Sequence, residues 1–215
     1  MPPEAYVFDA YGTLYDVHSV IARCETLWPG QGARLSQLWR ARQLEYTWLR
    51  SLMRRYAPFS QVTRDALAYA CGALELPLDR PKGDVLMQAY QNLALFPDVR
   101  GAMERLRGRR KAILSNGSPD MLDPLVANSG LQLDAVLSVD RAKIFKPAPE
   151  VYQLAVDALK LPKENIGFVS SNCWDAIGAK SFGFRTFWIC RSSISLDVLG
   201  VSPDAILGSL EELPI

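Results

Sequence analysis

The most constraining feature of this chain is the stretch at residues 6–17, where a short apolar run ends in a carboxylate and then a glycine. Residues 5–8 predict a strand buried on both faces, as in a parallel sheet. Asp9 would then lie at the carboxyl end of that strand, where open α/β sheets bind their ligands. Gly12 allows a sharp turn after it. This stretch alone leaves two interpretations open, a functional carboxylate or an Asp that only caps the turn.

The composition indicates a globular chain without a general attraction for polyanions. The chain has 215 residues, 49% of them hydrophobic, enough for one large domain or for a core with an insertion. It carries 24 basic and 23 acidic residues, so we expect neither nucleic acid nor a membrane surface as a partner. The chain starts without a basic leader, and no apolar run reaches the roughly 20 residues of a membrane helix. We therefore expect a cytoplasmic protein.

Cysteine and histidine usage narrows the chemistry. The four cysteines are scattered without a C-x-x-C pair, which favours reduced thiols over a disulfide or zinc framework. His18 is the only histidine. A Ser-His or Cys-His mechanism is therefore excluded unless His18 itself serves, and so are most zinc sites.

The predicted elements place a helical segment inside an alternating α/β chain. Residues 34–56, 62–74 and 85–95 carry apolar side chains at helical spacing, with breaks at Pro58, Gly72 and residues 77–83. After Pro97, predicted strands at residues 112–115, 135–139, 166–170, 185–189 and 205–207 alternate with predicted helices at residues 98–108, 119–128, 149–160 and 174–182. Repeated βα units predict a parallel sheet covered on both faces, so the earlier helices are an insertion.

Polar residues follow four segments of the predicted sheet at one edge. These are Asp9, Ser115-Asn116-Gly117, Lys146-Pro147 and Ser170-Ser171-Asn172-Cys173-Trp174-Asp175. Each one alone can be explained as a turn, a solvated lysine or a charge in the first turn of a helix. Their joint occurrence at consecutive strand ends favours a shared site.

The string Phe8-Asp9-Ala10-Tyr11-Gly12-Thr13-Leu14 resembles the nucleophile motif of the haloacid dehalogenase superfamily. Its Asp-Ala-Tyr-Gly-Thr form resembles the branch that hydrolyses L-2-haloacids, and the four polar stretches match the superfamily's motifs in order and spacing. The resemblance spans essentially the whole chain. It implies a Rossmann-like α/β core at residues 1–15 and 97–215, with an inserted helical-bundle cap at residues 16–96. Relatives also imply a possible homodimer.

Two departures separate this chain from the superfamily's phosphatases. Those enzymes carry a second Asp two residues after the nucleophile, which protonates the leaving alcohol and helps to hold magnesium; here that residue is Tyr11. They also place acidic magnesium ligands in the fourth motif, where this chain has Ser170-Ser171-Asn172 and only Asp175 is acidic. A halide leaves as a stable anion and requires neither group. The sequence therefore favours carbon–halide cleavage without a metal or any other cofactor.

The resemblance implies roles for the residues that attack the substrate and receive the halide. Asp9 is the nucleophile, and Lys146 is the lysine whose charge makes the approach of an anionic haloacid tolerable. Arg40 matches the cap arginine that reaches into the site. Asn116 and Trp174 match residues that line the halide pocket in related enzymes.

The same resemblance implies how the rest of the substrate is held and how the product is released. We expect the substrate carboxylate at the Ser115 hydroxyl and at free backbone N–H groups near Asn116 and Gly117. Asp175 is the candidate for activating the water that hydrolyses the ester, with Asn172 and Lys146 nearby. Thr13, Tyr152 and Ser170 line or brace the site, and the apolar wall is expected from Tyr11, Leu44, Phe59 and Trp174. Leu44 and Phe59 are equally well explained as ordinary core.

The sequence thus predicts a hydrolase that converts short L-2-haloalkanoic acids to D-2-hydroxy acids and halide through an ester on Asp9. Two alternatives stay open. A magnesium-dependent phosphatase of the same superfamily is disfavoured by Tyr11 and by Ser170-Ser171. A catalytically silent protein that keeps the fold to bind a ligand is disfavoured by the joint presence of Asp9, Lys146, Arg40 and Asp175.

Overall fold

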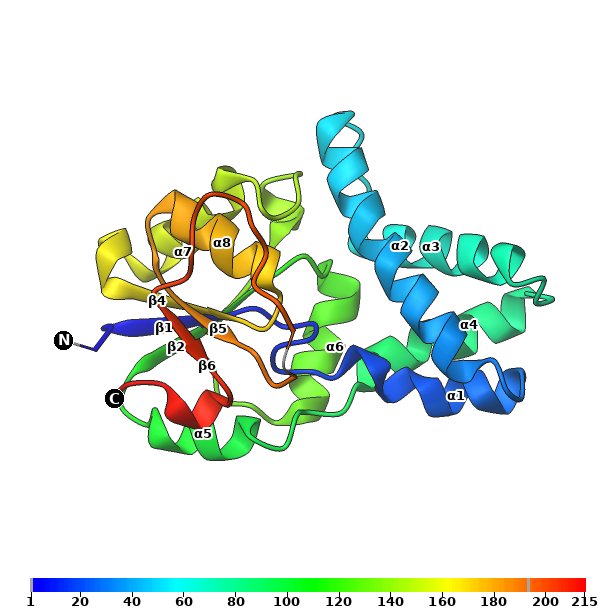
Figure 1. The fold of residues 1–215 in the computed structure, drawn as a ribbon, viewed down its shortest axis with the longest axis horizontal. Helices are drawn as coiled ribbons and strands as arrows, with labels where there is room; N and C mark the ends of the chain where they lie inside the picture. Colours follow the sequence, from blue (N-terminus) through cyan, green and yellow to red (C-terminus); the bar gives the residue numbers. More distant parts are fainter. Residues whose placement is uncertain (1, 193) are drawn as a thin grey trace.

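The computed structural model describes residues 2–192 and 194–215, in which one parallel sheet is flanked by helices (Figure 1). Among these residues, six strands pair in the order β3-β2-β1-β4-β5-β6, and every adjacent pair is parallel. This is the strand order of a doubly wound Rossmann-type sheet. The strands are β1 (Ala5–Phe8), β2 (Arg110–Ser115), β3 (Ala135–Ser138), β4 (Ile166–Ser170), β5 (Arg185–Ile189) and β6 (Ala205–Leu207). The predicted fold class is confirmed.

Helices cover both faces of this sheet. They are α5 (Val99–Arg105), α6 (Pro119–Ser129), α7 (Pro149–Leu159) and α8 (Cys173–Phe182), with short 3₁₀ turns at Val139–Arg141, Lys163–Asn165 and Leu210–Glu212. In Figure 1, α7 and α8 lie over one face and α5 lies over the other. Proline begins α6 and α7, where a missing N–H leaves no helical bond unmade. The strand β1 is completely buried between these layers.

A second group of helices lies beside the core, on the side away from both chain termini (Figure 1). It contains a 3₁₀ turn at Val17–Val20, α1 (Ile21–Leu27), α2 (Gly32–Leu52), α3 (Phe59–Ala73), α4 (Arg80–Ala89) and a 3₁₀ turn at Tyr90–Asn92. We refer to this group as the cap. Its two longest helices, α2 and α3, are joined where the Trp39 indole donates to the Thr63 carbonyl at 2.8 Å.

Several details of the cap differ from the sequence prediction. Gly72 lies inside α3 and is not a break, and α4 spans Arg80–Ala89 where a helix over residues 85–95 is predicted. The helix α1 was not predicted. The helix α2 ends at Leu52 and not at Pro58, and Arg54 just beyond it adopts a left-handed backbone conformation with φ of 54°. Gly83 lies inside α4 and is not part of a break, because the Asp79 carboxylate caps that helix by accepting from Lys82 N at 2.9 Å.

The two connections between cap and core run side by side. Asp16 N donates to Ala94 O at 2.8 Å, and Phe96 N donates to Leu14 O at 3.0 Å. The predicted division has a core at residues 1–15 and 97–215 and a cap at residues 16–96, and it stays a prediction. Its limits lie next to these two hydrogen-bonded connections. Among the described residues, no helix is long and apolar enough to cross a membrane.

Candidate active site

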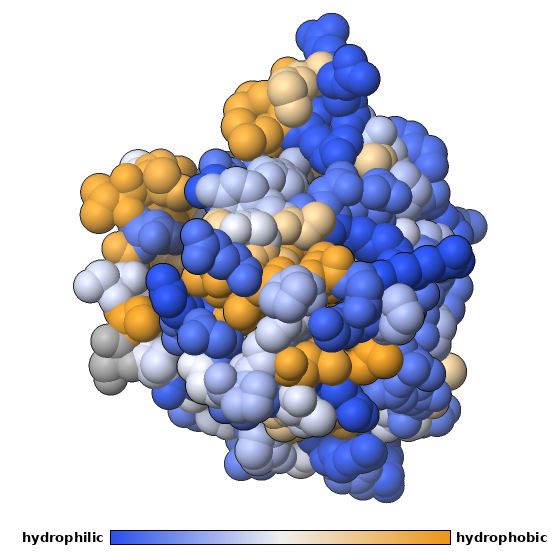
Figure 2. Space-filling model, turned by 90° about the vertical axis from the view of Figure 1, so that its right-hand side faces the viewer, coloured by the Kyte–Doolittle hydropathy of each residue, from blue (hydrophilic) through white to orange (hydrophobic). Residues whose placement is uncertain are grey.

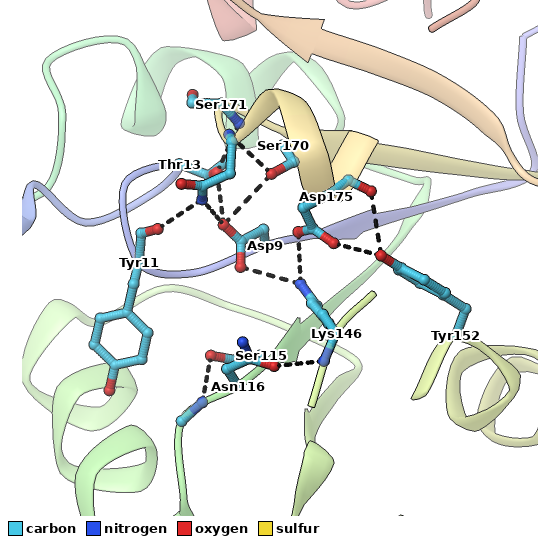
Figure 3. A network of polar contacts seen from close by, with 12 residues as sticks. Asp9, Tyr11, Thr13, Ser115, Asn116, Lys146, Tyr152, Ser170, Ser171 and Asp175 are labelled. Carbon is cyan, nitrogen blue, oxygen red and sulfur yellow. Dashed lines mark hydrogen bonds and ion pairs between the residues drawn. The ribbon is translucent and has the colours of Figure 1, made fainter. Parts of the chain in front are cut away.

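Asp9 directly follows β1, the strand that lies between β2 and β4 at the point where the strand order reverses. Gly12, with φ of +89°, then turns the chain back over the strand end. The Asp9 carboxylate is buried and held by four side-chain donors (Figure 3). Oδ2 accepts from Asn172 Nδ2 at 2.7 Å, Thr13 Oγ1 at 3.0 Å and Ser170 Oγ at 3.5 Å. Oδ1 accepts from Lys146 Nζ at 3.1 Å.

The direction of the Thr13 hydrogen bond is fixed by its neighbours. Ser171 N donates to Thr13 Oγ1 at 2.8 Å, so the hydroxyl has its proton free to donate to Asp9. Asn172 Nδ2 also donates to the Tyr11 carbonyl at 3.0 Å, which ties the loop after β4 to the loop after β1. These bonds fix the orientation of the Asp9 carboxylate before any substrate is bound.

Lys146 joins Asp9 to a second buried carboxylate. Its Nζ lies 2.8 Å from Asp175 Oδ2, and the Tyr152 hydroxyl donates to Asp175 Oδ1 at 2.8 Å (Figure 3). Gly178 on α8 permits this approach, because a Cβ there would lie 2.6 Å from the Tyr152 hydroxyl. One ammonium group is therefore shared between two carboxylates, in a cluster of buried side chains of which Asp9 keeps a small exposed fraction.

Burial and charge act in opposite directions on this pair. Burial raises the pKa of Asp175 to about 6 against the charge of Lys146, and Asp9 adds to the rise. Burial alone would lower the pKa of Lys146, but the charges of Asp175 and Asp9 outweigh it and raise that pKa. Near neutral pH, Asp175 is thus a carboxylate and Lys146 an ammonium group.

The loop after β2 supplies Ser115 and Asn116, both buried. Asn116 Oδ1 accepts from Lys146 N at 3.0 Å, which ties this loop to the segment of Lys146. The Gly117 N–H donates to Ser115 Oγ at 3.0 Å, so the prediction that this N–H is free for a ligand is wrong. A serine hydroxyl readily accepts from the N–H two residues later, and the turn after β2 uses this local bond.

The cap contributes Arg40 from α2. Its Nη1 donates to Gln43 Oε1 at 2.7 Å, and its Nη2 lies 3.3 Å from the Tyr11 carbonyl. Burial lowers the pKa of Arg40, and nearby Tyr90 and Asp9 oppose that effect. The structure therefore brings the predicted cap arginine against the loop that carries Asp9.

Aromatic rings close the space beside Asp9. The Tyr11 ring lies 5.4 Å from the ring of Phe59 on α3 and 6.3 Å from that of Tyr90, centre to centre. Burial raises the pKa of the Tyr11 phenol strongly, so the phenol stays neutral. Its hydroxyl is buried and has no hydrogen-bond partner among the described residues. Phe59 also packs against Phe145, at 6.3 Å.

Trp174 and Leu44 occupy different surroundings. Trp174 packs edge-on against Trp48 of α2, with ring centres 5.4 Å apart. It lines a largely apolar cavity of about 530 Å³ together with Trp48, Leu52, Phe145, Lys146 and Leu199. Leu44 is half-buried on α2.

Sequence reasoning missed Arg191, which follows β5 at the same edge of the sheet. Its guanidinium donates to Ser171 Oγ and to Thr13 O, each at 3.0 Å, and pairs with Asp98 at 2.9 Å. It also lies 4.1 Å above the Phe96 ring, in the second connection to the cap. Its place at a strand end is the signal that could have identified it. Sequence reasoning also missed Gln43 and Thr63, which hydrogen-bond to each other in the cap. Neither residue belongs to a motif that could have identified it.

Residues that could hold a metal ion do not gather here. Within residues 2–192 and 194–215, no three His, Cys, Asp or Glu side chains cluster as ligands would. The two carboxylates of the site, Asp9 and Asp175, are instead bridged by the Lys146 ammonium.

Comparisons with known proteins agree with this geometry. The haloacid dehalogenase-like hydrolase family matches residues 3–183. An (S)-2-haloacid dehalogenase of Pseudomonas sp. (strain YL) is 50% identical over 211 residues, covering 96% of this chain and 91% of that protein. A haloacetate dehalogenase H-2 of Moraxella sp. (strain B) is 47% identical over 205 residues, covering 94% of this chain and 92% of that protein.

A solved structure is similar along its whole length. It is an L-2-haloacid dehalogenase from Xanthobacter autotrophicus with chloropropionic acid covalently bound, and it superposes with a TM-score of 0.94 at 41% identity. The match covers 99% of this chain and 97% of that one. With the family match, these similarities show that the chain belongs to the haloacid dehalogenase-like hydrolases.

Proposed function

We propose that this chain is a hydrolytic (S)-2-haloacid dehalogenase that converts short L-2-haloalkanoic acids to D-2-hydroxy acids and halide, without a metal. The observation that carries this proposal is the uneven bonding of the buried Asp9 carboxylate. Three donors hold Oδ2, whereas Lys146 is the one side chain of the described residues that donates to Oδ1. Similarity to a dehalogenase that holds chloropropionic acid covalently supports an ester as the intermediate.

The first step is an attack by Asp9 Oδ1 on C2 of the substrate. Oδ1 keeps lone pairs that Lys146 does not use, whereas the donors on Oδ2 hold the carboxylate in place. The new bond joins Oδ1 to C2, and the electron pair of the carbon–halogen bond leaves with the halide. Attack from the side opposite the halide inverts C2. The Lys146 charge offsets the repulsion between two anions.

The groups that bind the substrate come from both sides of the site. The Ser115 hydroxyl holds the substrate carboxylate, since its oxygen already accepts from Gly117 N and its proton is left to donate. Arg40, with Asn116 and Trp174, receives the halide. The apolar wall around the alkyl group is assigned to Tyr11, Leu44, Phe59 and Trp174.

The second step is hydrolysis of the ester at the Asp9 carboxyl carbon. Water attacks this carbon, and Oδ2 takes the negative charge under the donors of Thr13 and Asn172, which act as an oxyanion hole. Asp175 accepts a proton from the water and, as the ester bond breaks, returns it to the oxygen that leaves with C2. Each Asp175 oxygen has a second acceptor position beyond its bond to Lys146 or Tyr152.

The origin of the product oxygen tests this mechanism. One turnover with excess enzyme in heavy-oxygen water should give a D-2-hydroxy acid with ordinary oxygen and leave the label in Asp9. Repeated turnovers should then yield labelled product. Label in the product of the first turnover would show direct attack by water and contradict the ester. Asp9→Asn should release no halide, because an amide is a poor nucleophile, and its mass should be checked for deamidation.

We also propose that the chain forms a homodimer through an apolar surface beside the cavity at Trp174. Figure 2 shows hydrophobic side chains gathered in patches on the face that carries the cap. Leu52 at the end of α2 is 81% exposed and Val198 is 96% exposed, while Met53 and Leu199 are exposed beside them in sequence. Light scattering should find a dimer, and Leu52→Glu with Val198→Glu should give a monomer. A monomeric wild type would contradict this proposal.

We further propose a cytoplasmic location. All four cysteines are free thiols, and Cys24, Cys71 and Cys173 are buried. A tagged full-length chain should appear in the cytoplasmic fraction of a bacterial host and not in the periplasmic fraction. Recovery from the periplasm would contradict the proposal.

A further inference from the structure

Arg40 differs from Arg42 and Arg50 of α2 because its hydrogen-bond partners are neutral and theirs include carboxylates. Arg42 pairs with Glu45 at 2.5 Å, and Arg50 pairs with Asp65 at 2.6 Å. Arg40 has only neutral partners, the Gln43 side-chain oxygen and the Tyr11 carbonyl, and it forms no ion pair with a described carboxylate. A cation in the site is thus held in place without being neutralised.

The orientation of the Gln43 amide is set from behind. The Thr63 hydroxyl donates to the Phe59 carbonyl at 2.7 Å, so its oxygen can only accept from Gln43 Nε2, which lies 2.7 Å away. This turns Oε1 of the amide toward Arg40. Gln43 and Thr63 are both completely buried, and the Trp39 indole holds the Thr63 carbonyl.

We propose that Gln43 is a positioning residue for Arg40, and that its neutral oxygen keeps the guanidinium charge available for the leaving halide. The inference rests on the proposed function. A glutamate would fill the same volume and accept the same hydrogen bond, but it would form an ion pair with Arg40. The amide at this position therefore affects the charge around Arg40 as well as the packing of the cap.

The charge balance of the site explains why this choice has an effect. Lys146 and Arg40 together match the charges of Asp9 and Asp175. A carboxylate at position 43 would make the site net negative before an anionic haloacid arrives. It would also oppose the growth of negative charge on the halogen during bond breaking.

The test compares substrates with poor and good leaving groups, L-2-chloropropionate and L-2-iodopropionate. Gln43→Glu should lower single-turnover halide release by about 100-fold for the chloro acid and about 10-fold or less for the iodo acid, because chloride needs more stabilisation. Asp65→Asn is the matched control, since it breaks another link between α2 and α3 without touching Arg40. It should change both rates by less than about twofold. Equal losses for both acids in Gln43→Glu would indicate a merely structural role and overturn the proposal.

Thr63→Val gives a second test if Gln43→Glu does not fold. The substitution keeps the shape of the side chain but removes the oxygen that orients the amide. A larger loss with the chloro acid than with the iodo acid is expected again. No loss, or an equal loss for both acids, would contradict the role of Gln43.

Bromide binding separates this inference from the proposed function. In crystals of wild type and Asp65→Asn soaked in bromide, we expect an anomalous peak beside the Arg40 guanidinium, and Gln43→Glu should lose it. Equal bromide occupancy in Gln43→Glu would overturn the inference whatever the turnover. A wild type that binds bromide as expected but releases no halide from either acid would contradict the proposed function alone.

Discussion

The core and the cap hold their charges in the site in opposite ways. In the core, Lys146 is bridged to Asp9 and Asp175 at 3.1 and 2.8 Å, and all three residues are buried. In the cap, Arg40 donates to two neutral oxygens and, within residues 2–192 and 194–215, forms no ion pair. The core therefore fixes a nucleophile within an ionic cluster of one cation and two carboxylates, and the cap presents a cation whose charge is still free to attract an anion.

The two arrangements also depend on different parts of the fold. The core residues follow parallel strands, whose carboxyl ends must meet at one edge of the sheet. Arg40 depends on the packing of α2 against α3 and on how the cap lies over the loop after β1. Changes in the core should disturb stability and chemistry together, and changes around Arg40 should disturb chemistry more selectively.

Lys146→Met tests the core half most severely. The change leaves two buried carboxylates without their shared cation, so we expect activity to fall on the order of 1000-fold and unfolding free energy to fall by about 3 kcal/mol. Halide release and urea unfolding measure the two effects. Lys143→Met is the control, since Lys143 is exposed and pairs with Asp140 on the surface. Near-normal activity and stability in Lys146→Met would show that the cluster is not a unit.

Arg40→Lys tests the cap half. A lysine keeps the charge but cannot keep the fork that contacts Gln43 and Tyr11 while facing the halide, so we expect about a 30-fold loss of halide release with little loss of stability. Arg42→Lys on the same helix should stay within about twofold, because its partner Glu45 is at the surface. Equal effects of the two substitutions would remove Arg40 from the site.

The core half of the site was the more predictable from sequence. Asp9, Lys146 and Asp175 follow segments whose convergence is a property of any parallel sheet, so finding the strands was enough to bring them together. The single wrong detail there, the Gly117 N–H, depends on a local side-chain bond that the motif pattern does not encode.

The cap half was less predictable, because helix packing is not specified by strand order. Gln43 has the appearance of a surface polar residue until α3 places Thr63 against it. The short helix α1 and the end of α2 at Leu52 were also missed, since apolar spacing alone marks helix ends poorly. The resemblance singled out Arg40, but only the folded cap identifies what holds it.

The pH dependence of turnover should distinguish the hydrolysis step, which depends on Asp175 of the core, from the earlier attack step, which Arg40 of the cap assists. The pKa of Asp175 is raised to about 6, and this residue must be deprotonated to accept a proton from water. Esterification removes the Asp9 charge that contributes to this rise, so the pKa of Asp175 in the ester should lie below that of the free enzyme. Below that lower pKa the hydrolysis step should slow about tenfold per pH unit, while attack by Asp9, helped by Arg40, changes less. Quenched-flow mass spectrometry should find that the share of enzyme present as ester rises as the pH is lowered stepwise from 8. Ester levels that do not change with pH would contradict Asp175 as the base.

Chelation should have the smallest effect, because Lys146 already fills the role that a divalent cation plays between two carboxylates. Its Nζ lies within 3.1 Å of both Asp9 and Asp175, and its raised pKa keeps it charged at neutral pH, so a cation bound there would have to displace an ammonium group. Halide release after dialysis against EDTA should equal that of the untreated enzyme, and added magnesium should change nothing. A magnesium-dependent phosphatase treated in parallel shows that the chelation worked. Activity lost with EDTA and restored by magnesium would mean that a metal ion, and not Lys146 alone, bridges the two carboxylates of the core, and the contrast drawn between core and cap would then be wrong.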